Sequence, residues 1–129
     1  MGKIEDLVMR NNAAFRRGDF EGALEGWSPE GELTPLPGGR TYRGHEEIQT
    51  FFSKDIYELP EFDFRIYTVL EQHEFALVFG RYSIYEGSKV VDRGIFWILE
   101  VRDDEVISFE AYETVGEAFA EFRSRLTVR

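Results

Sequence analysis

The sequence predicts an α+β fold in which helices come first along the chain and an antiparallel sheet follows. Two observations support this prediction. Apolar residues recur with helical spacing in the first half of the chain, and from residue 62 onward they alternate with polar residues, as in strands. A length of 129 residues with 43% hydrophobic residues suits one domain, residues 1–129, that folds without a disulfide or a metal.

Three helices are predicted before the main sheet. The apolar stripe of the first helix consists of Ile4, Leu7, Val8, Asn11 and Phe15. Gly18 supplies a left-handed stop, and Asp19 can cap a short second helix that ends by Gly26. A third helix is expected from about His45 to Tyr57, because its apolar residues keep helical spacing and Pro60 prevents it from continuing.

The strands follow the same logic of alternation and turn residues. Trp27 to Thr34 is predicted as a first strand, and a short extended piece covers Arg40 to Tyr42. A four-stranded antiparallel meander is then expected over residues 62–71, 75–85, 90–102 and 106–115. Helical spacing returns in the tail from Gly116 to Leu126, a helix that either covers a pocket or joins a dimer.

The last hairpin predicts which residues share a face of the sheet. We expect a three-residue loop, Asp103 to Glu105, because this register separates apolar from polar side chains best. One face then carries Ile95, Trp97, Leu99, Val101, Ile107, Phe109, Ala111 and Glu113. The opposite, mixed face carries Phe96, Ile98, Glu100, Arg102, Ser108, Glu110 and Tyr112.

Composition excludes several classes of function. The formal net charge of −10 argues against a nucleic-acid partner and against an anionic membrane surface, and it is read mainly as a source of solubility. The chain has no cysteine, and no segment resembles a signal peptide or a membrane span, so we expect a cytoplasmic protein.

No cofactor and no metal are expected either. His45 and His73 fall on different predicted elements without ligand spacing, and no phosphate-binding glycine loop is present. The acidic run from Asp103 to Glu105 lacks the spacing of a calcium loop and is read as turn chemistry.

Three segments, in this order, resemble the SnoaL-like domain of the nuclear transport factor two-like superfamily. They are the end of the first helix at residues 16–20 (Arg-Arg-Gly-Asp-Phe), the start of the third helix at residues 42–48 (Tyr-Arg-Gly-His-Glu-Glu-Ile), and the closing hairpin at residues 101–107, with Tyr112 beyond it. The resemblance implies a cone-shaped roll: three N-terminal helices packed on a strongly curved, mainly antiparallel sheet, with a pocket at the open end and a short C-terminal helix. It also implies a homodimer formed through the outer face of the sheet.

The resemblance implies an acid on the pocket side of the last strand, near the tyrosine. In this sequence Ala111 occupies that position, and Glu113 is the next residue on the same face. Glu113 is therefore the candidate catalytic residue, since a carboxylate desolvated beside Trp97 and Ile95 would have a raised pKa suited to acid/base work. The alternative places it beyond the end of the sheet, in solvent. A steroid-isomerase branch implies a tyrosine on the first helix, where this sequence has Asn11.

The remaining candidates are pocket residues. They are Asn11, Phe15, Trp27, Phe52, Tyr82, Ile95, Trp97, Phe109 and Ala111. Asn11 either bonds to backbone or faces the pocket, and the aromatic residues belong either to the core or to the pocket wall. Arg81 and Asp92 either lie at the pocket mouth or pair across strands on the surface.

Two functions stay open at this level. The first is a protein that binds a small, largely apolar molecule in the cone pocket, with cofactor-free acid/base chemistry of the isomerase, cyclase or hydratase type as an option. The second is a non-catalytic dimeric interaction or scaffold domain that uses the mixed outer face of the sheet. The fold alone does not decide between them.

Overall fold

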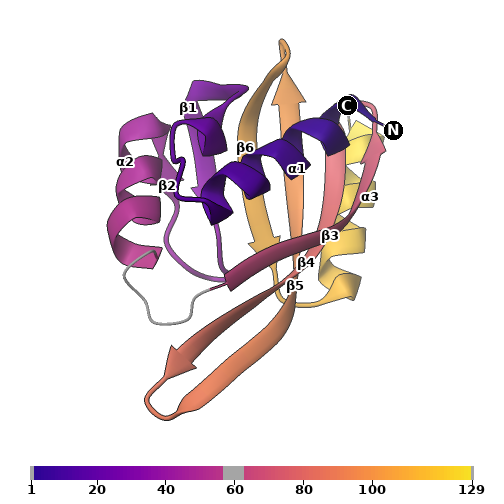
Figure 1. Ribbon diagram of the computed structural model, residues 1–129. Coiled ribbons are helices and arrows are strands. Elements are labelled where there is room, and N and C mark those ends of the chain that lie inside the picture. The colour runs from indigo at the N-terminus through magenta and orange to yellow at the C-terminus, as the bar shows by residue number, and fades with distance from the viewer. Residues whose placement is uncertain (1, 57–62, 129) are drawn as a thin grey trace.

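The structure, a computed structural model, describes residues 2–56 and 63–128, and these ranges hold a mixed six-stranded sheet in the order β2-β1-β6-β5-β4-β3 (Figure 1). The strands are β1 Trp27–Thr34, β2 Tyr42–Arg43, β3 Asp63–Gln72, β4 Phe75–Glu86, β5 Lys89–Arg102 and β6 Glu105–Tyr112. The helical segments are α1 Lys3–Arg16, η1 Gly22–Leu24, α2 Gly44–Thr50, η2 Phe51–Ile56 and α3 Val115–Val128.

The first helix ends as its sequence predicts. Gly18 adopts a left-handed φ of 81° just after α1. The Asp19 carboxylate then accepts a hydrogen bond of 2.9 Å from the backbone N–H of Gly22, where η1 begins. The second helix is therefore a single 3₁₀ turn, shorter than the segment predicted up to Gly26.

The third helix changes its winding partway along. It begins as the α-helix α2 and continues as the π-helical segment η2, whose wider turn is a rare geometry. Its predicted end at Tyr57 and its stop at Pro60 lie outside the described residues. Phe51 and Phe52, at the change of winding, both face the interior of the domain and reappear in the site below.

The predicted meander of β3 to β6 is confirmed by antiparallel pairing of each strand with the next. The pairing of β1 was not predicted. This strand lies between β2 and β6 and runs parallel to β6, with Leu33 beside Phe109. The strand nearest the start of the chain therefore closes against the strand nearest its end.

The closing hairpin corrects the expected loop. Its turn has two residues, Asp103 and Asp104, with φ of 53° and 64°, which is type I′ geometry. An irregularity in the pairing then leaves Ile107 without an opposite residue and turns Val106 inward, fully buried. Beyond this bulge the predicted register holds, with Trp97 opposite Ala111. The bulge absorbs the one-residue difference between the two loop lengths.

Helices cover both faces of the sheet. We call the face that carries Trp97 the inner face; α1, η1, α2 and η2 pack there around one hydrophobic group, the inner cluster. The opposite, outer face packs against α3 in a smaller group, the outer cluster, whose buried members are Phe75, Leu77, Ile98, Ala118 and Phe122. The tail helix thus covers the outer face of the sheet.

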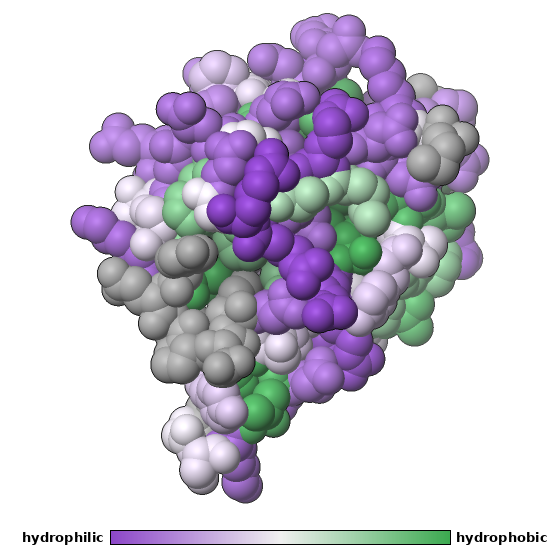
Figure 2. Space-filling model, in the orientation of Figure 1, coloured by the Kyte–Doolittle hydropathy of each residue, from purple (hydrophilic) through white to green (hydrophobic). Residues whose placement is uncertain are grey.

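In the view of Figure 2, hydrophilic residues cover most of the surface, and hydrophobic ones gather along the side on which α3 lies. None of the helices in the described ranges has the length and apolar character needed to cross a bilayer.

Candidate functional site

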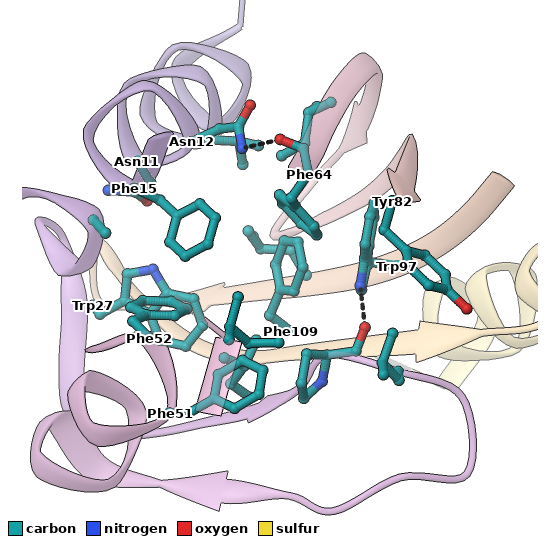
Figure 3. Close-up of a pocket in the computed structure, with 18 residues that line it drawn as sticks. Asn11, Asn12, Phe15, Trp27, Phe51, Phe52, Phe64, Tyr82, Trp97 and Phe109 are labelled. Atoms are coloured by element: carbon teal, nitrogen blue, oxygen red, sulfur yellow. Dashed lines mark hydrogen bonds between the residues drawn. The ribbon is translucent and has the colours of Figure 1, made fainter. Parts of the chain in front are cut away.

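The inner cluster surrounds a cavity of about 80 Å³ that is partly open to solvent. It lies between the N-terminal helices, the loop that follows β1 and the inner face of the sheet (Figure 3). The described residues that line it are Val8, Asn11, Asn12, Phe15, Ala23, Trp27, Leu33, Pro35, Leu36, Phe51, Phe52, Ile56, Phe64, Ile66, Tyr82, Trp97, Leu99 and Phe109. None of them carries a carboxyl, amine, guanidinium or imidazole group.

Aromatic rings in mutual contact form most of the wall. Along the sheet, Trp97 lies 5.5 Å from Phe109 and 4.8 Å from Phe64, measured between ring centroids. On the helical side, Phe15 lies 5.0 Å from Phe52 and 6.0 Å from Phe64. These spacings are those of favourable aromatic pairs, so the rings stabilise one another as well as the space between them.

The asparagine side chains of the wall donate hydrogen bonds to backbone carbonyls. Asn11 donates to the carbonyl oxygens of Gly22 and Glu25, at 3.2 and 3.0 Å. Asn12 donates to the carbonyl of Phe64 at 3.2 Å, as Figure 3 shows. The Asn11 side chain therefore does both things that the sequence left open: it bonds to backbone and it lines the cavity.

Trp97 is held at both ends. Its Nε1–H donates to the carbonyl of Pro35 at 3.1 Å, which ties the loop after β1 to the sheet. Its six-membered ring lies against Gly80 on the neighbouring strand, so closely that a β-carbon there would meet the ring at 2.8 Å and overlap the carbonyl oxygen of Arg65. The glycine thus leaves the room that the indole occupies.

The predicted pocket residues divide into two groups. Seven of them line the cavity: Asn11, Phe15, Trp27, Phe52, Tyr82, Trp97 and Phe109. Ile95 and Ala111 belong to the inner cluster, 1% and 5% exposed, but lie outside the lining set. The Tyr82 hydroxyl points away from the ring of aromatic side chains (Figure 3).

Glu113 lies elsewhere. It occupies the bend between β6 and α3 and is solvent-exposed, outside the residues that line the cavity. The alternation of β6 ends at Tyr112, so the chain has already turned before Glu113 reaches the inner face. The desolvated surroundings expected for its carboxylate are not those in the structure.

Sequence reasoning missed several lining residues. Phe64 and Ile66 alternate toward the inner face of β3, and Phe51 is one of the apolar residues with helical spacing in the predicted third helix. These three carried a usable signal in their periodicity. Pro35 and Leu36 lie in an irregular loop, where no periodic pattern indicates which way a side chain points.

The histidines do not form a site. His45 Nε2 lies 3.1 Å from the carbonyl oxygen of Trp27, and His73 occupies the β3–β4 turn with a φ of 59°. Within residues 2–56 and 63–128, no group of histidine and acidic side chains is arranged to hold a metal ion.

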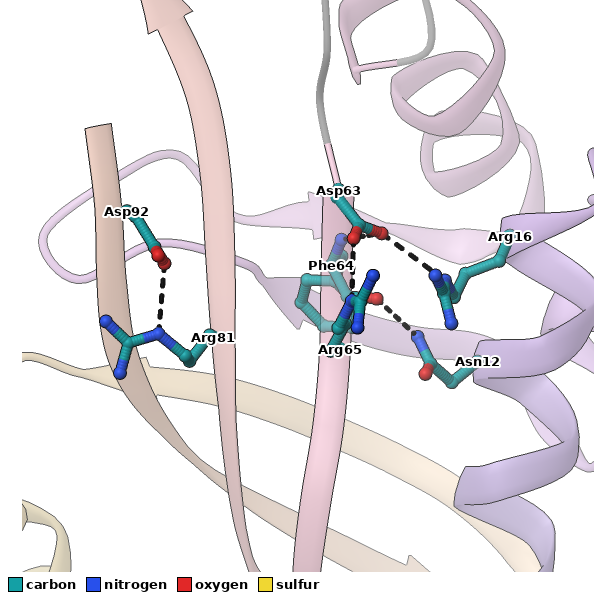
Figure 4. Close-up of polar contacts among 7 residues, drawn as sticks. All are labelled: Asn12, Arg16, Asp63, Phe64, Arg65, Arg81 and Asp92. Atoms are coloured by element: carbon teal, nitrogen blue, oxygen red, sulfur yellow. Dashed lines mark hydrogen bonds and ion pairs between the residues drawn. The ribbon is translucent and has the colours of Figure 1, made fainter. Parts of the chain in front are cut away.

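An ion-pair cluster lies at the end of α1 near the cavity (Figure 4). Asp63 contacts Arg65 at 2.8 Å and Arg16 at 3.3 Å. Partial burial opposes ionisation of Asp63, but the hydrogen bonds from Arg65 and the Phe64 N–H, with the charge of Arg16, hold its pKa below the usual range. Arg81 and Asp92 pair at 3.0 Å on the exposed surface, outside the lining set.

A second polar network holds α3 to the outer face. Arg125 contacts Glu110 at 2.9 Å and Glu121 at 2.8 Å, and Tyr112 donates to Glu110 at 2.9 Å. Burial and the hydrogen bond to Glu110 raise the pKa of the Tyr112 phenol well above its usual value. The tyrosine of the last strand therefore serves the contact with α3 and faces away from the cavity.

Both the sequence and the fold are similar to those of known proteins. A model of the SnoaL-like domain matches residues 8–109. An NTF2-like protein of unknown function from Burkholderia pseudomallei is 20% identical with a TM-score of 0.76, over 93% of this chain and 97% of that one. The structure of TerC, co-crystallised with polyporic acid, is 24% identical with a TM-score of 0.72, over 90% and 94% of the two chains.

A candidate SnoaL-like polyketide cyclase from Jannaschia sp. is 13% identical with a TM-score of 0.69, over 89% of this chain and 88% of that one. No curated protein sequence matches the chain significantly. The likeness to solved structures concerns the fold, and the family match covers most of the sequence, including every strand from β1 to β5 and the first half of β6. The chain belongs to the SnoaL-like domain family.

Proposed function

We propose that this protein, as one SnoaL-like domain over residues 1–129, binds a small and largely apolar molecule in the cavity of the inner cluster. The observation that supports it is a void of about 80 Å³ with an almost entirely apolar wall. Cavities with apolar walls take up apolar ligands. In this proposal the sheet and its helices form the cone-shaped roll of the family, and the ligand binds inside the cone.

The cavity supports ligand binding better than it supports catalysis. Proton transfer needs a titratable group within hydrogen-bond reach of the substrate. Among the described lining residues only Tyr82 carries an acidic hydroxyl, and that hydroxyl points away from the cavity. Cofactor-free chemistry of the isomerase, cyclase or hydratase type therefore has less support here than binding does.

A thermal-shift panel tests the binding proposal. Apolar compounds that range from one ring to fused rings and short alkyl chains should include at least one that raises the Tm of the wild-type protein. The same compound should leave the Tm of Ala23→Leu unchanged, because the added carbons occupy the cavity. If no apolar compound of any size raises the Tm, the proposed function is wrong.

A second candidate function rests on the outer face. Leu70 is 47% exposed and Phe119 is 38% exposed, and the Phe119 ring lies 6.1 Å from that of Phe79 on the same face. Large exposed apolar side chains in one area are typical of interaction surfaces. We propose that this area can pair two copies of the chain beside α3. Sedimentation at micromolar concentration tests the idea: a wild-type monomer contradicts it, and a dimer that Leu70→Lys dissociates supports it.

A further inference from the structure

The volume of the cavity limits the size of its ligand. An engineered cavity of about 150 Å³ lined by leucine, isoleucine and phenylalanine binds benzene. The cavity here measures about 80 Å³, roughly half as much. One ring therefore needs a wall side chain to yield or must extend through the open side of the cavity, and a second fused ring would project into solvent.

Among the described lining residues, the side chains on the sheet are the most firmly packed and Leu36 is the least. Trp97 and Leu99 are 0% and 1% exposed and are packed into the sheet, and Phe109 is 7% exposed. Interiors packed in this way resist displacement. Leu36, in the loop after β1, is 37% exposed and is the most exposed of the described lining side chains. Movement of Leu36 enlarges the cavity toward solvent by part of one side chain.

The polar groups of the wall limit the charge of the ligand. The amide N–H groups of Asn11 and Asn12 and the indole N–H of Trp97 already donate to backbone carbonyls. Across the described residues, no buried side-chain nitrogen or oxygen lacks a hydrogen-bond partner. A charged group that entered would lose its hydration without a matching donor or ion, and that loss is costly.

We propose that the cavity selects uncharged molecules no larger than a single six-membered ring with a small substituent, and that it excludes both fused-ring compounds and carboxylates. This inference deepens the proposed function and rests on it. The aromatic wall, from Phe15 and Phe52 to Phe64, Trp97 and Phe109, is the selecting surface. Aromatic rings such as these pair favourably with the ring of a flat, unsaturated guest.

Three probes test the inference. Toluene represents the single neutral ring, benzoate adds a carboxylate to the same ring, and naphthalene adds a second ring. The chain has 2 tryptophans, Trp27 and Trp97, and both line the cavity, so intrinsic fluorescence reports on this site for toluene and benzoate. The shift in Tm compares all three compounds on one scale.

We expect saturable binding of toluene, and binding of benzoate and naphthalene that is weaker by at least tenfold. Ala23→Leu fills the cavity and should abolish the response to toluene. Ala13→Leu makes the same chemical change at an exposed position of α1 and should leave it intact. Equal binding of benzoate, or tighter binding of naphthalene than of toluene, overturns the inference and leaves the proposed function standing. The absence of any response to toluene overturns the inference, and the proposed function falls with it only if no compound of the apolar panel raises the Tm.

Discussion

The two hydrophobic clusters on opposite faces of the sheet are filled in different ways. The outer cluster closes α3 directly onto the strands, with Leu77, Ile98 and Ala118 all 0% exposed. The inner cluster is larger and richer in aromatic rings, yet it leaves about 80 Å³ unfilled. At about 24 cal/mol per Å³, a closed void of that size forgoes roughly 2 kcal/mol of stability, and a cavity partly open to solvent forgoes no more than that. Folding alone therefore explains the outer cluster, whereas the inner cluster carries a cost that a ligand would offset.

The largest difference in stability is expected between substitutions of two glycines on neighbouring strands. Gly80→Ala would overlap the carbonyl of Arg65 and press on the Trp97 ring, and we expect it to lower the free energy of unfolding by about 3 kcal/mol. Gly94→Ala meets nothing closer than 4.0 Å and should change stability by less than about 0.5 kcal/mol. Urea denaturation measures both. Equal effects would mean that the indole does not depend on the space at Gly80.

Enlarging one alanine in each cluster tests the difference in filling directly. Ala118→Leu adds volume to the closed outer cluster and should cost about 2 kcal/mol through overpacking. Ala23→Leu adds the same volume beside the cavity and should cost less than about 1 kcal/mol, since open space receives the new carbons. Thermal denaturation of the two variants side by side provides the measurement. A reversed order would contradict the cavity itself.

The network around Arg125 should contribute more to stability than a fully exposed ion pair does. Its side chain is only 20% exposed and bonds to Glu110, Glu121 and Tyr112. Arg125→Met removes these partners and leaves Glu110 half-buried without its cation, so we expect a loss of about 1 kcal/mol. Arg81→Met, which breaks an exposed pair with Asp92, serves as the control and should cost almost nothing.

Asp63 should make the stability of the protein weakly dependent on pH. Its pKa is lower in the folded state than in the unfolded chain, so its contribution is complete above the unfolded value and disappears as pH falls through the folded one. Because the side chain is 34% exposed, we expect less than about 1 kcal/mol. The difference in stability between wild type and Asp63→Asn should therefore shrink as the pH is lowered from 6 toward 3. A constant difference would exclude this linkage.

The smallest effect is expected at Glu113. Since its side chain is exposed and outside the cavity wall, Glu113→Gln should leave the binding of toluene unchanged. Fluorescence titration of the variant beside the wild type checks this. A clear loss of binding would return Glu113 to the site.

Much of the fold follows from periodicity alone. The alternation in β3 to β6 and the stop at Gly18 depend on local sequence, and they were predicted close to their observed bounds. The parallel pairing of β1 with β6 was not, because nothing near either strand specifies a partner so distant along the chain. The bulge at Ile107 was not predicted either. A two-residue loop with one unpaired residue and a three-residue loop without one give the same register beyond the bulge, so the pattern of apolar residues does not distinguish them.

The site was harder to predict than the fold. Aromatic residues on apolar faces, such as Phe15 and Trp97, were natural candidates for its wall. Whether the rings touch or leave a space between them depends on where the helices lie. The π-helical winding at Phe51 and Phe52 cannot be predicted from the pattern of apolar residues. Glu113 was favoured because alternation was extended one residue beyond the point where β6 ends.

The pairing of β1 with β6 also has a consequence for the order in which the molecule can assemble. During synthesis, β1 leaves the ribosome early, yet it has only the two-residue β2 beside it until β6 follows. Contacts this far apart in the chain slow folding, because a long loop must close before they form. The inner cluster, and with it the cavity, is therefore completed only after β6 has been made.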